Sequence, residues 1–177
     1  NRKLLVFAVP HMAEHKIISK QEHITTLNEV FNHLARGNGF NTVLSIHPMG
    51  NYEFYSSAAK QYNFPIIEQN LNEILPVADL FLASYSSTVE RATRLGIPTF
   101  VLDYGLNYSM FDHIKGLKII KDIRYLTDIL APVLHQSEEY KNYSELLASS
   151  FSKELFDGKA CERIIQTIKQ NVGNSKH

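Results

Sequence analysis

Three small hydroxyl residues, Ser86-Ser87-Thr88, follow Tyr85 where an apolar run gives way to a helical pattern. The run from Asp79 to Ser84 is typical of a buried strand. A helix N-terminus has free backbone N–H groups and about half a positive elementary charge. Small hydroxyl side chains there add O–H donors and let the backbone approach a ligand. The pattern therefore predicts a site for phosphate or pyrophosphate.

A purely structural interpretation of the same loop is also open. Ser87 and Glu90 have the Ser-x-x-Glu spacing of a capping box, in which the serine hydroxyl and the glutamate carboxylate satisfy backbone N–H groups of the first turn. Capping explains two of the residues, but it does not explain three consecutive hydroxyl residues after Tyr85.

Histidines follow two other predicted strands. His47-Pro48 ends an apolar run from Thr42 to Ile46, and His47 can donate to a phosphate or a sugar hydroxyl, or can cap a neighbouring carbonyl. His11 and His15 lie in the loop after the first strand, where they can reach a sugar or can simply be surface residues. Asp103, after the fifth predicted strand, is a further candidate. No metal-binding spacing of His or Cys occurs, so we expect no metal.

These candidates need a scaffold that brings loop ends together. The sequence predicts strands alternating with helices, and the predicted strands are 3–9, 42–46, 64–67, 79–84, 98–103 and 117–121. The sequence predicts a helix after Ser19, helices over 51–62 and 71–75, and a helix that begins at the Ser86-Ser87-Thr88 cluster. The stretch of about 125–172 is also predicted to be helical. This alternation indicates an α/β fold, a doubly wound, mostly parallel sheet of about six strands. Ligands of such sheets bind at the carboxyl ends of strands, near the switch in strand order.

Length and composition narrow the class of protein. The 177 residues suit one domain, residues 1–177, with C-terminal helices from about 125 to 172. Equal numbers of acidic and basic residues, 18 of each, argue against non-specific nucleic-acid binding. No apolar run reaches the ~18–20 residues of a membrane span. No glycine-rich loop follows the first strand, which argues against a nucleoside triphosphatase and a nicotinamide-dependent dehydrogenase.

A single cysteine, Cys161, excludes an internal disulfide, and we expect a cytoplasmic protein. Cys161 shares the apolar stripe of the last helix with Ile164, Ile165 and Ile168. The stripe predicts that Cys161 lies in the core.

The order of these motifs resembles a known superfamily. The stretch Ala78–Thr88, continuing through Gly96-Ile97-Pro98 to Leu102, resembles the C-terminal, nucleotide-sugar-binding half of GT-B glycosyltransferases. It is also similar to UDP-N-acetylglucosamine 2-epimerases and to capsule and teichoic-acid polymer synthases. Ser45-Ile46-His47-Pro48 resembles the His-Pro element of that half. Asp157–Ala160 with Glu162–Ile164 resembles the start of its terminal helix, so the resemblance covers about residues 3–170.

The resemblance implies a role for each matching position. Tyr85 and the Ser86-Ser87-Thr88 loop would hold the diphosphate of a nucleotide sugar, and His47 would lie near the donor phosphates or sugar. The segment 66–68, with Ile67 at its centre, would contact the base through its backbone.

One position departs from the superfamily's pattern. An acidic residue five positions before the glycine normally takes the ribose hydroxyls, and here that position is Arg91, with Glu90 beside it. Either Glu90 serves after a slight helix shift, or the ribose is held otherwise and Arg91 pairs with a phosphate.

The function implied is that of the donor-binding half of a glycosyltransferase in polysaccharide or glycoconjugate biosynthesis. A UDP-sugar is the expected substrate, no cofactor is expected, and the resemblance assigns no catalytic residue. GT-B enzymes need a second, N-terminal Rossmann-like domain, so we expect this chain to bind donor without turnover. Two alternatives stay open: an epimerase-like isomerase, whose expected double Glu is reduced to Glu90-Arg91, and a non-catalytic flavodoxin-like module, for which only Glu14 follows the first strand.

Overall fold

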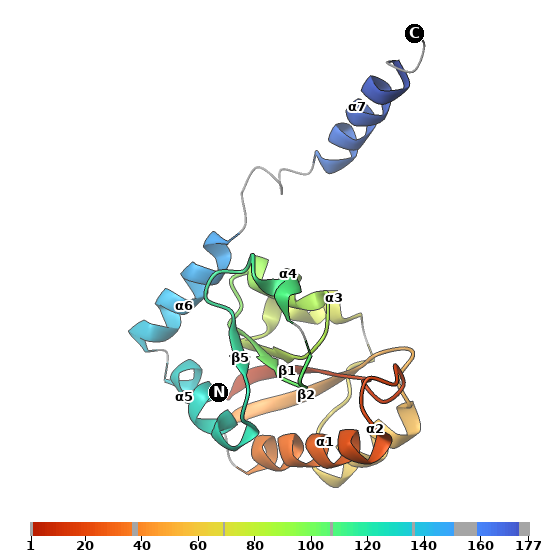
Figure 1. Cartoon of the computed structure of the whole chain (residues 1–177). Helices are drawn as coiled ribbons and strands as arrows, with labels where there is room; N and C mark the ends of the chain where they lie inside the picture. The colour runs from red at the N-terminus through yellow and green to blue at the C-terminus, as the bar shows by residue number, and fades with distance from the viewer. Residues whose placement is uncertain are drawn as a thin grey trace.

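The computed structural model describes residues 2–36, 39–68, 70–106, 108–135, 137–150 and 159–173. Its centre is a five-stranded, all-parallel sheet with the order β2-β1-β3-β4-β5 (Figure 1). The strands are β1 (Lys3–Val9), β2 (Phe40–Ile46), β3 (Leu80–Ala83), β4 (Thr99–Leu102) and β5 (Lys118–Ile120).

Helices cover both faces of the sheet, as the doubly wound prediction requires. The α-helices are α1 (Lys20–Ala35), α2 (Tyr52–Gln61), α3 (Leu71–Ile74), α4 (Thr88–Arg94), α5 (Leu126–Leu134), α6 (Glu138–Ser149) and α7 (Ala160–Gly173). Three short 3₁₀ turns are η1 (Leu75–Val77), η2 (Ser109–Phe111) and η3 (Ile123–Tyr125). In Figure 1, α1 and α2 lie on one side of the sheet and α3 and α4 on the other. α5 packs against α1, and α6 packs against α4.

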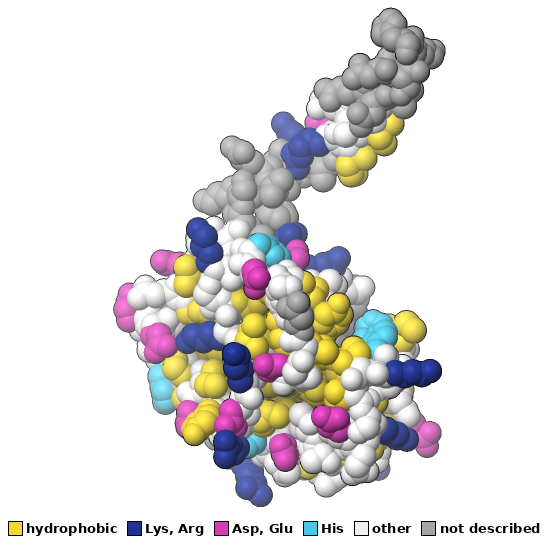
Figure 2. Space-filling view, in the orientation of Figure 1, with side chains coloured by type: hydrophobic (Ala, Val, Ile, Leu, Met, Phe, Trp, Pro, Cys, Tyr) yellow, Lys and Arg dark blue, Asp and Glu magenta, His cyan; other side chains and the backbone are white. Residues whose placement is uncertain are grey.

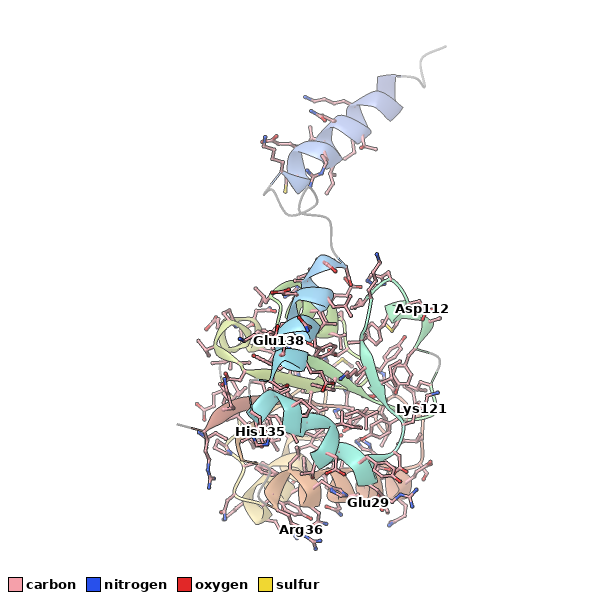
Figure 3. All side chains as sticks on the ribbon, turned by 90° about the vertical axis from the view of Figure 1, so that its left-hand side faces the viewer. Glu29, Arg36, Asp112, Lys121, His135 and Glu138 are labelled. Atoms are coloured by element: carbon pink, nitrogen blue, oxygen red, sulfur yellow. The ribbon has the colours of Figure 1, made fainter. Side chains whose placement is uncertain are left out.

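Burial of the strands on both faces explains why they read as continuous apolar runs. Leu5, Val6 and Phe7 of β1 are fully buried, as is every residue of β3. Parallel sheets covered by helices on both faces favour such runs over alternation. Figure 3 shows α5 and α6 lying across one side of the molecule, with Arg36 and Glu138 at the surface.

The prediction of a strand at 64–67 is wrong, and the sheet has five strands instead of six. Ile66 makes only an isolated parallel bridge to Leu44 of β2. The backbone N–H of Leu44 donates to Pro65 O, and that of Ile67 donates to Leu44 O, both at 2.8 Å. Two bonds at the sheet edge do not extend into a ladder, and Pro65 itself has no N–H to contribute.

The strand order nevertheless places a switch point beside β1. The chain passes from β1 to β2 on one side, and then to β3 on the other side of β1. With the Ile66 bridge counted as a third position, the order is that of a Rossmann fold. Ligands of such folds bind at the carboxyl ends of the strands flanking this point, which here are β1, β2 and β3.

The C-terminal helix α7 lies apart from the sheet and its covering helices (Figure 1). Its apolar stripe is exposed, with Ile164, Ile165 and Ile168 each at least half accessible. Hydrophobic side chains follow one side of this helix in Figure 2. Cys161 is exposed too, so the prediction that it lies in the core is wrong. Asp157-Gly158, the start of the predicted terminal motif, lies outside the described residues.

None of the described helices is long and apolar enough to cross a membrane.

Candidate functional site

A cavity of about 720 Å³ opens at the carboxyl ends of β1, β2 and β3. Its walls come from four stretches of the described chain, and the lining residues are 8–11 with 15, 45–49, 67–68 with 70–72, and 84–88 with 91. The predicted site residues that line it are His11, His15, His47, Ile67, Tyr85, Ser86, Ser87, Thr88 and Arg91. Parallel strands deliver these loops to one edge of the sheet, which is why distant stretches of sequence meet here.

Hydrogen bonds of Ser84 hold the start of the loop after β3. Ser84 is buried, and its hydroxyl donates to Leu102 O at 2.9 Å and lies 3.1 Å from the Tyr108 hydroxyl. These contacts tie the end of β3 to β4. Tyr85 beyond the anchor is 51% exposed and lines the cavity.

The hydroxyl residues do not form the capping box that the sequence allows. Ser87 is the N-cap of α4, but its backbone is helical and its side chain makes no capping hydrogen bond. Instead Ser86 Oγ accepts from the backbone N–H of Thr88 at 3.2 Å. The Ser87 hydroxyl is exposed at the cavity rather than committed to the helix end. The capping interpretation of Ser87 and Glu90 is therefore wrong.

Three histidine rings gather at the side of the cavity formed by β1 and β2. The register pairs Val9 with Ile46, so the loops that carry His11 and His47 leave the sheet side by side. The His11 and His47 rings stack with centroids 4.1 Å apart and planes 12° apart. His15 Nε2 lies 2.7 Å from His11 Nε2, so one of the two nitrogens donates and the other accepts.

Protonation of His11 is disfavoured. Burial lowers the pKa of His11 below 6.5, and the neighbouring His47 and His15 lower it further, while Glu14 partly opposes them. At neutral pH His11 is uncharged and offers one N–H donor. Among the described residues, no group of three or more His, Cys, Asp or Glu side chains is arranged to hold a metal ion.

A hydrogen-bond network behind the histidines fixes their loop. A Glu14 carboxylate oxygen accepts from the backbone N–H of Asn51, the N-cap of α2, and from the Tyr55 hydroxyl, both at 2.9 Å. His23 Nε2 of α1 lies 2.9 Å from the same hydroxyl. Since Tyr55 donates its single proton to the carboxylate, His23 donates to Tyr55. This network joins α1, α2 and the loop after β1, and nothing in the sequence beyond the types of the residues predicts it.

The network also shifts the titration of its members. Burial opposes ionisation of Glu14, but its hydrogen bonds outweigh this, and the pKa of Glu14 is lowered. Burial lowers the pKa of His23 and raises that of Tyr55. The ionised carboxylate, neutral imidazole and neutral phenol are thus all favoured.

Glu90 and Arg91 face different ways. The Glu90 carboxylate pairs with Arg94 at 3.0 Å and lies 3.5 Å from His113, and Glu90 does not line the cavity. Arg91 does line it, and its Nη1 donates to Asn72 Oδ1 at 2.5 Å. Of the two candidates for the acidic position, the structure therefore brings Arg91 to the cavity and turns Glu90 away.

Two other predicted residues differ in their placement. Asp103 lies outside the cavity, where its carboxylate accepts from the backbone N–H of Gly105 at 2.7 Å. Ile67 lines the cavity, but its N–H is bonded to Leu44 O, so only its carbonyl is available to a ligand. Sequence reasoning missed Asn72, which follows the predicted base-contacting segment by a few residues.

Solved structures share this architecture. The C-terminal CMP-Kdo binding domain of WaaA from Acinetobacter baumannii superposes with a TM-score of 0.58 at 14% identity, over 85% of this chain and 89% of that one. WaaG, a glycosyltransferase involved in lipopolysaccharide biosynthesis, gives 0.58 at 15% identity, over 84% of this chain and 42% of that one. The wall teichoic acid polymerase TagF gives 0.58 at 18% identity, over 100% of this chain and 44% of that one.

The chain has the fold of a GT-B C-terminal domain. The resemblance read from the sequence is confirmed at that level. No family model matches the chain, and no curated protein is significantly similar to it in sequence. The chain spans less than half the length of WaaG and of TagF, so this GT-B fold corresponds to one part of each of those proteins.

Proposed function

We propose that the chain is the nucleotide-sugar-binding half of a glycosyltransferase. The observation that carries this proposal is the cavity itself, which is lined by the residues chosen from sequence after three different strands: His11, His47 and the Ser86–Thr88 loop. The fold neighbours support it, because the WaaA domain is a CMP-Kdo binding domain and a TagF structure was obtained with CDPG. A donor diphosphate would accept hydrogen bonds from Ser87, Thr88 and the histidine rings.

The mechanism follows from this placement. Glycosyl transfer from a nucleotide sugar releases a nucleoside phosphate, on which negative charge develops in the transition state. Donors already fixed around that charge stabilise it without reorganisation. The Ser84 anchor and the Glu14 network hold the two loops that would supply those donors.

The acceptor and the catalytic base would come from elsewhere. We infer that an N-terminal Rossmann-like domain completes the enzyme, because the chain matches 42% of WaaG and 44% of TagF. On this proposal the isolated chain binds a nucleotide but does not turn it over. A UDP-sugar remains our proposed donor, with cytidine nucleotides as the alternative that the WaaA and TagF neighbours favour.

The two alternative functions fit the cavity less well. An epimerase-like isomerase needs carboxylates for proton transfer at the sugar. Among the described residues that line the cavity, Glu68 is the sole carboxylate. A flavodoxin-like module has no acidic cluster after β1, where Glu14 is already bonded to Asn51 and Tyr55.

Isothermal titration of the 177-residue chain with UDP, CDP and CMP tests the proposal. We expect at least one of them to bind, and the double variant Ser87→Ala, Thr88→Ala to weaken binding by about 1.5–3 kcal/mol for each hydrogen bond to a charged phosphate. Ser56→Ala, on α2 and away from the cavity, is the matched control and should bind like the wild type. Failure of all three nucleotides to bind at millimolar concentration would overturn the assignment.

A further inference from the structure

Arg91 brings a guanidinium to the cavity. Among the described lining residues it is the one Lys or Arg side chain, and Glu68 is the one carboxylate. Arg91 lies three residues after Thr88 on α4, so both side chains lie on one face of the helix. Its partner Asn72 belongs to α3, on the wall formed by residues 67–68 and 70–72. The guanidinium therefore bridges the wall that begins at Ile67 and the hydroxyl loop.

This guanidinium is oriented without being neutralised. No described Asp or Glu lies within ion-pair distance of Arg91, whereas Arg94, one turn away on the same helix, pairs with Glu90 at 3.0 Å. Asn72 contributes a neutral amide oxygen that occupies one of the five guanidinium N–H groups. The remaining N–H groups form the planar fork that suits a phosphate.

We propose that Arg91, oriented by Asn72, binds a phosphate of the nucleotide and makes the site selective for nucleoside phosphates regardless of the ribose 2′-hydroxyl. This inference rests on the function proposed above. It follows from the position of the group, because a cation between the hydroxyl loop and the wall that contains Ile67 and Asn72 lies where the phosphates of a nucleotide spanning both would pass. Glu90 is paired with Arg94 and turned away, so α4 presents no described carboxylate to the ribose hydroxyls, and the one described carboxylate in the cavity, Glu68, follows Ile67 on the other wall.

Substitutions of Arg91 and of Asn72 test whether the charge of the guanidinium binds the phosphate. Titrations use the 177-residue chain with CDP, UDP, their 2′-deoxy forms and the free nucleosides. Arg91→Gln should weaken diphosphate binding about 10- to 100-fold, the cost of losing hydrogen bonds to a charged group. Asn72→Asp should weaken it comparably, because a carboxylate of the same shape would pair with the guanidinium. The affinities of the 2′-deoxy forms should lie within about threefold of those of the ribonucleotides, because no hydrogen bond to a charged group is lost with the 2′-hydroxyl.

Two controls make the result specific. Arg94→Gln removes a charge of the same type from the same helix outside the cavity, and should bind within about twofold of the wild type, as expected for screened surface charge. Arg91→Lys keeps the charge but loses the fork, and should give an intermediate affinity. Circular dichroism melting checks that each variant folds. If Arg91→Gln does not fold, the affinity of Arg91→Lys is the test instead.

The outcomes distinguish this inference from the proposed function. If the wild type binds CDP or UDP and the Arg91→Gln and Asn72→Asp variants bind equally well, the role of Arg91 is refuted while the donor site stands. A large preference for ribonucleotides over 2′-deoxy forms would likewise refute it. If the wild type binds none of the diphosphates, both are overturned.

Discussion

At the scale of single residues, the types of side chain in the cavity matter less than the partners that hold them. His11 is a neutral donor because burial and the neighbouring histidines lower its pKa, and Arg91 is a charged donor whose partner, Asn72, is a neutral amide. The two kinds of donor face one cavity from different strands. A diphosphate placed there would meet neutral N–H and O–H groups together with one guanidinium.

The Glu14–Tyr55–His23 network leads to a prediction on stability. Tyr55→Phe removes the hydroxyl that bonds both Glu14 and His23, and Tyr55 is almost fully buried. Leaving such partners unsatisfied costs about 1–3 kcal/mol each. We expect Tyr55→Phe to lower the free energy of unfolding by that order at every pH between 5.5 and 7.5, as measured by urea denaturation. Glu14 stays ionised in both folded and unfolded chains over that range, so its lowered pKa acts only at more acidic pH.

We expect a different effect from His23: its substitution should change how steeply the free energy of unfolding depends on pH. Burial lowers its pKa below 6.5, so as pH falls the unfolded chain takes up the proton first. Its contribution to stability is fully present above that pH and is lost as pH falls through 6.5 toward the folded pKa. His23→Gln retains an N–H donor for Tyr55 and should make the free energy of unfolding less dependent on pH between 7.5 and 5.5. An unchanged slope would contradict this account of His23, although His11, whose pKa is also lowered, keeps part of the dependence.

At the scale of secondary-structure elements, two serines that precede helices behave differently. Ser19 Oγ accepts from the backbone N–H of Glu22 at 3.1 Å and caps α1, whereas Ser87 makes no such bond at α4. Ser19→Ala should therefore cost about 1 kcal/mol of unfolding free energy, and Ser87→Ala should change it by less than about 0.5 kcal/mol. Chemical denaturation of both variants under the same conditions gives the comparison. A large loss for Ser87→Ala would restore the capping interpretation.

The same contrast shows what the sequence could and could not predict. Apolar runs located all five strands, and the rule on carboxyl ends located the loops that meet in the cavity. Local spacing at Ser87 and Glu90 matched a capping box, but the backbone at Ser87 is already helical, which periodicity does not reveal. The bonds from Glu14 to Tyr55 and from Tyr55 to His23 join residues 41 and 32 positions apart. Contacts of this kind depend on how helices pack, so one sequence gives no signal for them.

At the scale of the whole molecule, the amphipathic patterns of α6 and α7 look alike in the sequence, but only that of α6 corresponds to a buried face. A stripe of apolar residues shows which face of a helix avoids water, but not what covers that face. The stripe of α6 includes Tyr143 and Leu147, which are buried beside α4 and β4. The stripe of α7 includes Ile164, Ile165 and Ile168, which are exposed. The wrong prediction for Cys161 arose from treating these two situations as one.

This difference can be measured with two substitutions that remove the same kind of apolar surface. Leu147→Ala would leave a cavity under α6, where Leu147 is fully buried, and should lower the free energy of unfolding by about 2–5 kcal/mol. Ile165→Ala in α7 removes a half-exposed side chain and should change it by less than about 0.5 kcal/mol, because little packing is lost. Urea denaturation of the two variants, followed by circular dichroism, gives both values. A loss of several kcal/mol for Ile165→Ala would contradict this account, because a loss of that size requires the Ile165 side chain to be buried in the folded chain.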